Sequence, residues 1–356
     1  MKSPINFKNV VIWFVLAVSL VGAARSMAGD KQILYPMRKA FKIEHGQKWK
    51  QGFMDRQGRI IIEPQFSKVK PFTDGVARVA EAGEWGFIDQ NGHYLVKPVY
   101  SWTADFSEGL AQVMIRKEAG EQTDLKTAFI DKSGEVVIDA KFDFNSRKEG
   151  YFRNGLAPVA QDGQWGFINP QGIFVIPKQF SDAHNFSEGL APVQKNGKWG
   201  YIDVQGQVII DFTFERVAAF SEGLAAVVLN GKWGFISKKG EVVIDPAFDY
   251  RYYGTPAFSQ GVANVMQGDQ WGFINKKGAF KIEPQFELAA GFNDDLAKVI
   301  QDGQCGFINQ TGTMVIAPQY ITAEDFYHGL AFVMVTQNPD RYAYIDTNGQ
   351  VVWQSD

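Results

Sequence analysis

Hydrophobic and polar residues alternate along the chain in short runs that are typical of β-strands. The stretch NGKWGYIDVQGQVII, residues 196–210, begins with Asn196-Gly197. One alternating run precedes this pair and a second follows it. Asn-Gly readily adopts the left-handed dihedrals of a two-residue hairpin turn. Asp203 and Gly206 are typical of a further tight turn. We therefore expect three antiparallel strands, over residues 190–195, 198–203 and 207–210.

The same pattern returns at a nearly constant spacing. An aromatic residue after a tryptophan–glycine pair, or after its variant, marks nine units, at Phe53, Phe87, Phe129, Phe167, Tyr201, Phe235, Phe273, Phe307 and Tyr344. A second marker, written FSEGLAPV from Phe186, follows in most units. A fixed period of 20 to 50 residues is the signature of a repeat architecture, so we expect one repeat domain from about residue 40 to the end.

The tryptophan–glycine pair is best interpreted as a packing element. A two-residue turn at 196–197 places Trp199 and Tyr201 on a bulky face and Gly200 on a small face. Buried apolar area stabilises by roughly 25 cal/mol per Å², and glycine, which has no Cβ, lets another backbone come close. The expected structural residues are Trp85, Gly86, Trp165, Gly166, Trp199, Gly200, Trp233, Gly234, Trp271 and Gly272.

With these motifs the chain resembles the WG-repeat proteins of bacteria. Their pattern G-x-W-G-F/Y-I-D-x-x-G is closest in GKWGYIDVQGQVII, from Gly197, and in GEWGFIDQNGHYLVKPVY, from Gly83. The resemblance implies tandem β-units, often on exported proteins, and no shared catalytic residues. Cys305 and Ala128 depart from the pattern, in the tryptophan and glycine columns.

The expected fold is all-β: an elongated, twisted, solenoid-like array of about nine three-stranded antiparallel units. Propellers usually have four to eight blades of four strands each, which nine three-stranded units fit poorly. A closed β-propeller-like ring is the alternative.

The N-terminal residues predict a secretory signal peptide. Lys2 and Lys8 precede an apolar run over residues 10–22, and small residues follow up to Ala28. The expected boundaries are 1–28 for the signal, 29–39 for a linker and 40–356 for the repeats. The predicted signal peptide implies that the protein is exported to the periplasm or the cell surface. A retained anchor is the alternative, although the apolar run is shorter than the roughly 20 residues that span a bilayer.

Composition excludes two classes of protein. Removing residues 1–28 takes away three basic residues and no acid, so the formal net charge goes from −3 to −6. Nucleic acid is therefore not an expected partner, because phosphate binding requires clustered Lys and Arg. Cys305 is the single cysteine, so no internal disulfide forms.

Candidate catalytic and metal-binding residues are few. The four histidines His45, His93, His184 and His328 fall in different repeat columns, without metal-ligand spacing. The column of Asp74, Glu108, Glu188 and Glu222 allows acid–base work on a glycan, but an acid–glycine pair is ordinary turn chemistry. Asp89, Asp131, Asp203 and Asp346 suit a local Asx-turn better than calcium. We expect no catalytic residue, cofactor or metal.

Irregular segments indicate where a partner binds, because insertions in repeat proteins often map to a binding face. Two units carry longer loops, DFNSRKEGYF from Asp143 and DYRYYGTPAF from Asp249. The candidate partner surface is Phe144, Arg147, Tyr151, Tyr250, Arg251, Tyr252 and Tyr253. The hypothesis is a non-enzymatic, exported protein that binds another protein. Binding of cell-wall or surface polysaccharide is the alternative, and a glycan-acting enzyme is a remote one. If the longer loops only lengthen the array and bury their own aromatic residues, they have no binding role.

Overall fold

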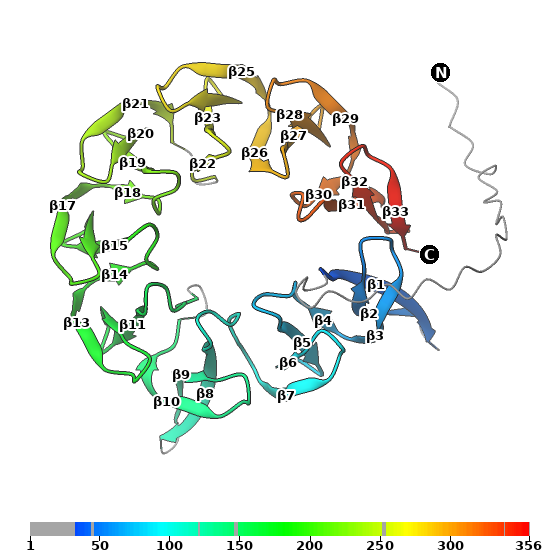
Figure 1. Ribbon diagram of the computed structural model, residues 1–356, viewed down its shortest axis with the longest axis horizontal. Helices are drawn as coiled ribbons and strands as arrows, with labels where there is room; N and C mark the ends of the chain where they lie inside the picture. Colours follow the sequence, from blue (N-terminus) through cyan, green and yellow to red (C-terminus); the bar gives the residue numbers. More distant parts are fainter. Residues whose placement is uncertain are drawn as a thin grey trace, which may run out of the picture. The chain divides into compact units, whose positions relative to one another are not determined.

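The computed structural model describes residues 33–355, except 44–45, 120–121, 146–148, 251–253 and 338. These residues belong to one compact unit, Gln32–Asp356, in which eight antiparallel sheets are arranged in a ring, as in a β-propeller (Figure 1). Every named element of the described residues is a β-strand. None of them forms a helix long and apolar enough to cross a membrane.

The sheets follow one another in chain order. The first holds β1 (Tyr35–Ile43), β2 (Gly46–Met54) and β3 (Ile60–Phe66). The second holds β4 (Lys68–Val69), β5 (Ala77–Glu81), β6 (Glu84–Ile88) and β7 (Tyr94–Tyr100). The third has six strands, β8 (Ala111–Ala119), β9 (Gln122–Ile130), β10 (Val136–Asp143), β11 (Ala157–Gln161), β12 (Gln164–Ile168) and β13 (Phe174–Phe180).

Five four-stranded sheets complete the ring. They hold β14 (Asp182–Ala183), β15 (Leu190–Lys195), β16 (Lys198–Asp203) and β17 (Val208–Phe214); β18 (Arg216–Val217), β19 (Leu224–Leu229), β20 (Lys232–Ser237) and β21 (Val242–Asp249); and β22 (Phe258–Ser259), β23 (Val262–Gln267), β24 (Gln270–Asn275) and β25 (Phe280–Phe286). The last two hold β26 (Leu288–Asn293), β27 (Leu296–Gln301), β28 (Gln304–Asn309) and β29 (Met314–Tyr320), then β30 (Thr322–Ala323), β31 (Leu330–Thr336), β32 (Arg341–Asp346) and β33 (Val351–Gln354).

Nine repeat units occupy these eight sheets, because the six-stranded sheet joins two of them. A single residue pair, Asp143 with Ala160, connects β10 to β11. We number the units along the chain: unit 1 is β1–β3, unit 2 is β4–β7, unit 3 is β8–β10, unit 4 is β11–β13, and units 5 to 9 are the four-stranded sheets that follow. The first strand begins at Tyr35, before the expected boundary at residue 40.

The expected elongated array is wrong in its overall form, and the ring that was kept as the alternative is observed. The three strands expected in each unit are present, but most units add a short fourth strand. In unit 5 this strand is β14, which pairs through Asp182 with Gln194 and through Ala183 with Val193. Short strands such as β14, β18 and β30 lie toward the middle of the ring, and β17, β21 and β29 lie at its outside (Figure 1).

The expected hairpin register is confirmed. Trp199 pairs with Gln194, and Tyr201 pairs with Pro192. Asn196 and Gly197 have φ of 53° and 76°, the left-handed pair of a type I′ turn. Both faces of the hairpin are buried, because each unit is packed between two neighbours.

The core consists of successive layers between units. Trp199, Tyr201 and Phe220 pack with Ala225 and Val227, so the bulky face of unit 5 meets the small face of unit 6. An aromatic pair recurs at each such boundary: Tyr201 and Phe220 have ring centroids 4.9 Å apart. Equivalent pairs at the other internal boundaries have centroids 4.7 to 5.2 Å apart. No unit could bury these faces alone.

The glycine of the tryptophan–glycine pair lets another backbone come close, as expected, and that backbone belongs to its own unit. A Cβ on Gly200 would lie 2.5 Å from the carbonyl oxygen of Ile210, in the outer strand of its own unit. The outer strand bulges at this point, between the pairs Trp199–Phe214 and Tyr201–Ile210. Glycine therefore accommodates this bulge within the unit, and not the backbone of another unit.

The ring closes by side-chain packing, and no sheet mixes strands from the two ends of the described chain. Tyr35 and Tyr344 form an aromatic pair 5.9 Å apart, and the Tyr35 hydroxyl donates to the carbonyl oxygen of His328 at 2.7 Å. The Arg38 guanidinium lies 3.6 Å from the centre of the Tyr342 ring. We call this boundary between units 9 and 1 the seam.

Candidate functional site

The acids of the Ser-Glu-Gly marker join neighbouring units. The Glu188 carboxylate accepts the N–H of Gly223 at 3.1 Å and pairs with Lys238 Nζ at 3.0 Å, both in the next unit. Burial alone would raise the pKa of Glu188, but the bonds from Lys238 and Gly223 hold it below its usual value. Bonds to a glycine N–H or a lysine of the next unit recur at Asp74, Glu108, Glu222 and Asp294. The acids of this column therefore hold neighbouring units together, and we call each such contact a clasp.

The aspartates of the second turn cap their own backbone. Asp203 Oδ1 accepts the N–H groups of Gln205 at 3.0 Å and Gln207 at 2.8 Å. The same two bonds form at Asp89, Asp131 and Asp346. The expected Asx-turns are confirmed. Within the described ranges no group of three or more His, Cys, Asp or Glu is placed to hold a metal ion.

Cys305 fills the position of a tryptophan in unit 8. It is buried, and burial raises the pKa of its thiol, so the reactive thiolate is disfavoured. Its Sγ lies 4.0 Å from the carbonyl oxygen of Ile321. The interpretation of Cys305 as packing is therefore consistent with its surroundings.

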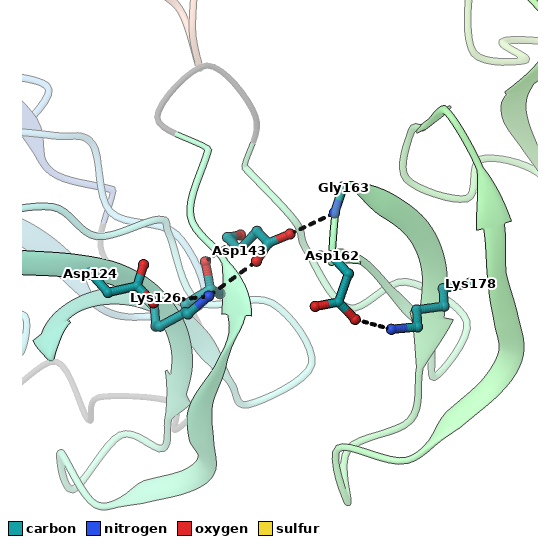
Figure 2. Close-up of polar contacts among 7 residues, drawn as sticks. Asp124, Lys126, Asp143, Asp162, Gly163 and Lys178 are labelled. Carbon is teal, nitrogen blue, oxygen red and sulfur yellow. Dashed lines mark hydrogen bonds and ion pairs between the residues drawn. The ribbon is translucent and has the colours of Figure 1, made fainter. Parts of the chain in front are cut away.

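Each of the two longer loops begins with an aspartate that is anchored to the next unit. The Asp143 carboxylate pairs with Lys126 Nζ at 3.2 Å and accepts the N–H of Gly163 at 3.0 Å (Figure 2). The hydrogen bonds to Asp143 and then Asp124 raise the pKa of Lys126. Asp249 repeats this arrangement with Lys232 and with the N–H of Gly268, which lies at 2.7 Å.

The first longer loop is also fastened at its far end. The N–H of Tyr151 donates to Asn185 Oδ1 at 2.9 Å, and Asn185 Nδ2 donates to the carbonyl oxygen of Glu149 at 3.1 Å. The Glu149 carboxylate lies 3.3 Å from the guanidinium of Arg78, which is buried in unit 2. This loop therefore connects units 2, 4 and 5.

Two adjacent hollows lie beside these loops. The first, about 230 Å³, is lined by Glu149, Gly150, Pro158, Trp165, Ala183, His184 and Asn185. The second, about 280 Å³, is lined by Asp182, His184, Trp199, Arg216, Val217, Trp233, Tyr250, Gly254 and Thr255. His184 lines both, so the two hollows are neighbours, and we call them together the tryptophan groove.

Four of the nine residues that line the second hollow carry aromatic rings. The rings of His184 and Trp199 are 4.8 Å apart, and those of Trp233 and Tyr250 are 5.9 Å apart. The Arg216 guanidinium lies 5.3 Å from the centre of the Tyr250 ring. Trp233 is 3% exposed, and its indole N–H has no hydrogen-bond partner within the described structure. The groove thus combines ring faces, a cation and a buried donor.

The structure places part of the expected partner surface at this groove. Tyr250 lines it, and Tyr151 is next to Gly150 in its wall. Phe144 packs on Trp102 instead, with ring centroids 5.2 Å apart. Arg147, Arg251, Tyr252 and Tyr253 lie outside the described residues.

Sequence reasoning missed Asp182, His184 and Arg216 as groove residues. They lie in or directly after the short fourth strands, which the three-stranded reading of each unit assigned to loops. The signal that identifies them is their position, two to four residues after the aromatic residue, Phe180 or Phe214, that ends the preceding unit.

One solved structure has a similar fold over most of the chain. A structure described as the eukaryotic initiation factor aligns with a TM-score of 0.62 at 12% identity, over 91% of this chain and 96% of that one. AztD of Citrobacter koseri aligns with a TM-score of 0.45 at 10% identity, over 91% and 95% of the two chains. Chaetomium thermophilum Sqt1, bound to the N-terminus of ribosomal protein L10, aligns with a TM-score of 0.41 at 12% identity, over 69% of this chain and 84% of that one. At these identities the first likeness concerns the fold alone.

The sequence itself identifies the family. Comparison with curated proteins gives no significant match. The model of the WG containing repeat matches eight times, at residues 52–84, 85–117, 128–165, 165–199, 199–233, 233–271, 271–305 and 306–337. These matches cover most of the chain and recur with the period of the units, so the chain belongs to the family of WG-repeat proteins.

Proposed function

We propose that this protein is a non-enzymatic binding protein that takes an extended segment of a partner protein into the tryptophan groove. The observation that carries the proposal is the pair of neighbouring hollows that share His184. Both longer loops contribute to their walls, through Glu149 and Gly150 and through Tyr250, Gly254 and Thr255. Two neighbouring hollows suit an extended polypeptide, because successive side chains of the segment can occupy both.

The groove also indicates what the segment must present. The unpartnered N–H of Trp233 is a buried donor, which gains most from an acceptor such as a peptide carbonyl or a carboxylate. Arg216, at the same hollow, adds a positive charge that is exposed to solvent. Tyrosine, tryptophan and arginine are enriched among the residues that dominate binding energy at protein interfaces. We therefore expect an apolar segment with an acidic residue.

Polysaccharide binding has less support. Sugar recognition by stacking needs aromatic faces open to solvent, but Trp199, Trp233 and Trp271 are buried at 8%, 3% and 8% exposure. Trp85 and Trp165 are half-buried. The aromatic rings of the repeat are thus largely used in packing, and polysaccharide remains an alternative outcome of the test.

We also propose export to the periplasm or the cell surface, on the strength of residues 1–28. These residues lie outside the described structure, so the proposal rests on the basic, apolar and small-residue pattern alone. Fractionation of cells that express the full chain, with the N-terminus of the product determined by mass spectrometry, tests both export and cleavage after Ala28.

Site-specific photo-crosslinking tests the groove. A photoreactive residue at Thr255, in the groove, is compared with one at Gln207, in an exposed turn on the same ring. We expect one protein adduct at Thr255 that the Arg216→Glu substitution abolishes, and none at Gln207. Equal adducts at both positions would contradict the proposal, and co-sedimentation of the protein with cell-wall sacculi would favour the polysaccharide alternative.

A further inference from the structure

The inner edge of unit 1 differs from that of the other units. β1 is an edge strand that pairs on one side only, with β2. In units 2, 5, 6, 8 and 9 the equivalent edge is covered by a two-residue pairing with a short inner strand, at Lys68-Val69, Asp182-Ala183, Arg216-Val217, Leu288-Ala289 and Thr322-Ala323. The described part of unit 1 has no such strand.

The strand register identifies the main-chain groups of β1 that face this edge. Pro36 pairs with Phe53 as Ala226 pairs with Phe235, and Arg38 pairs with Gln51 as Val228 pairs with Trp233. In unit 6 the inner strand uses both carbonyl groups: the N–H of Glu215 donates to Val228 at 3.1 Å, and that of Ala218 donates to Ala226 at 2.8 Å. The carbonyl oxygens of Arg38 and Pro36 are the matching acceptors at the seam.

A proline at this position is compatible with strand pairing. In unit 5 the equivalent residue is Pro192, whose carbonyl oxygen accepts the N–H of His184 at 2.9 Å. The pairing needs the carbonyl of this residue and not its N–H. Pro36 therefore leaves the edge of β1 able to accept a strand.

A pocket of about 290 Å³ lies beside this edge. It is bounded by residues that follow the short strands of the two flanking units, on one side Lys70 and Pro71 and on the other Glu324 and Asp325. Pro36, Met37 and Arg38 of β1 contribute directly to its wall. The pocket thus lies between the neighbouring short strands, where the inner strand of unit 1 would belong.

Two sequence differences contribute to this space. Gln51 stands where other units have the tryptophan of the repeat, and its Oε1 accepts the N–H of Val69 at 2.7 Å. The aromatic slot that a loop phenylalanine fills at each internal boundary is filled here by Tyr35, from β1 itself. Tyr35, Leu330, Phe332 and Tyr344 give the pocket an apolar lining.

We propose that the seam pocket binds an extended segment of a partner protein, which supplies the inner strand that the described part of unit 1 lacks. Main-chain N–H groups of the segment donate to the carbonyl oxygens of Arg38 and Pro36, as in other cases of strand addition to a sheet edge. The inner strands of the ring itself show the side chains that fit: the second residue is Val69, Ala183, Val217, Ala289 or Ala323.

Charge indicates the residue that precedes this alanine or valine. The exposed carboxylate of Glu324 lines the pocket, whereas its neighbour Asp325 is paired with Lys298 Nζ at 3.2 Å. A basic residue, as in Arg216-Val217, complements Glu324. The ligand class is therefore an extended peptide with a basic residue followed by valine or alanine. The seam pocket shares no lining residue with the tryptophan groove, so this site stands independently of the proposed function.

The probe is a synthetic peptide with the sequence of residues 214–220, Phe-Glu-Arg-Val-Ala-Ala-Phe. Its binding to the purified full chain is measured by fluorescence anisotropy. The matched control peptide carries proline in place of the alanine at position 218, which removes the N–H that would donate to Pro36. We expect saturable one-to-one binding of the probe and at least tenfold weaker binding of the control.

Gln51→Trp is the decisive variant. It restores the tryptophan of the repeat and fills the pocket, so we expect at least tenfold weaker binding with no loss of thermal stability. Trp233→Phe, in the tryptophan groove, is expected to bind the probe as the unmodified chain does. Glu324→Lys should weaken binding of the probe and strengthen binding of a probe with Glu in place of Arg.

Hydrogen exchange distinguishes the possible occupants of the edge. In the free protein the Arg38 amide should exchange rapidly, and the probe should protect it. Absence of saturable binding, equal binding by Gln51→Trp, or an Arg38 amide already protected in the free chain would each overturn the proposal. The last result would indicate that residues of this chain's own N-terminal segment cover the edge.

Discussion

Replacing Gly200 by alanine tests whether the glycine column exists to accommodate the outer-strand bulge. The added Cβ would lie 2.5 Å from the carbonyl oxygen of Ile210 and 3.0 Å from the carbonyl carbon of Asp211. Both neighbours are backbone atoms, so they cannot move aside as a flexible side chain would. The bulge must shift by about 0.5 Å or more to reach a normal contact, with strain that overpacking puts at about 1–3 kcal/mol.

Two further contributions set the net magnitude. The φ of Gly200 is not positive, so alanine fits the backbone conformation and lowers the entropy of the unfolded chain, a gain of about 0.4–1 kcal/mol. A displaced ladder hydrogen bond costs about 0.5–1.5 kcal/mol. These contributions roughly cancel, so we expect Gly200→Ala to lower the free energy of unfolding by about 1–3 kcal/mol.

Urea unfolding followed by tryptophan fluorescence measures this change. The midpoint should fall while the dependence on urea concentration stays the same, because the surface exposed on unfolding does not change. Gly291→Ala is the matched control, since its Cβ would have no neighbour within 4 Å and its φ is not positive. If the two variants unfold at the same urea concentration, the bulge does not require glycine and the reasoning is refuted.

Three more predictions concern the contacts between units. Glu188→Gln should cost about 0.2–1 kcal/mol at pH 7. The folded-state pKa of Glu188 lies below 4.5, so its contribution is present above that value and is lost as the pH falls through the folded-state pKa. Urea unfolding should therefore show a smaller difference between the two proteins at pH 3 than at pH 7, and an equal difference at both would contradict this. Arg78→Met should cost about 1–3 kcal/mol, since it removes the buried cation that binds Glu149, and chemical denaturation that matches the unmodified chain would contradict this. His328→Glu should raise the midpoint of thermal unfolding. The substitution puts at the seam the acid that the other units have at this position, beside Arg56, whose guanidinium lies against Gly329. An unchanged or lower midpoint would show that no such acid–base contact forms at the seam.

The hairpin of each unit could be predicted because its determinants are local. Asn196-Gly197 sets the turn, and the turn fixes which residues lie opposite one another. The bulky and small faces follow from that register, and so does the role of Trp199 in packing. The Asx-turn at Asp203 is equally local, with both bonds made within four residues.

The ring could not be predicted in this way. All but one of its fourth strands have two residues, as at Asp182–Ala183, which is too short for any alternation to be visible. Closure depends on the angle between successive units, and this angle arises from packing between faces such as those of Trp199 and Ala225. No pattern within one unit encodes it.

The candidate site was predicted only in part. The longer loops pointed to residues that lie beside the tryptophan groove, and Tyr250 lines it, but Phe144 packs on Trp102. His184 and Arg216 differ from the residues at the same positions of other units, so the repeat pattern gave no reason to select them. The seam pocket depends on contacts between residues nearly 300 positions apart, such as Tyr35 and His328.

The absence of a shared sheet at the seam has a consequence for how the chain folds. Within the described residues every ladder of main-chain hydrogen bonds joins segments that are neighbours in sequence, so each unit can form while the rest of the chain is still disordered. Only the contacts across the seam require closure of a very long loop. The entropic cost of that closure must be offset by side-chain contacts alone. We therefore expect closure to be the last step of folding. A circular permutant opened at another unit boundary, with the present ends linked, should keep every ladder intact.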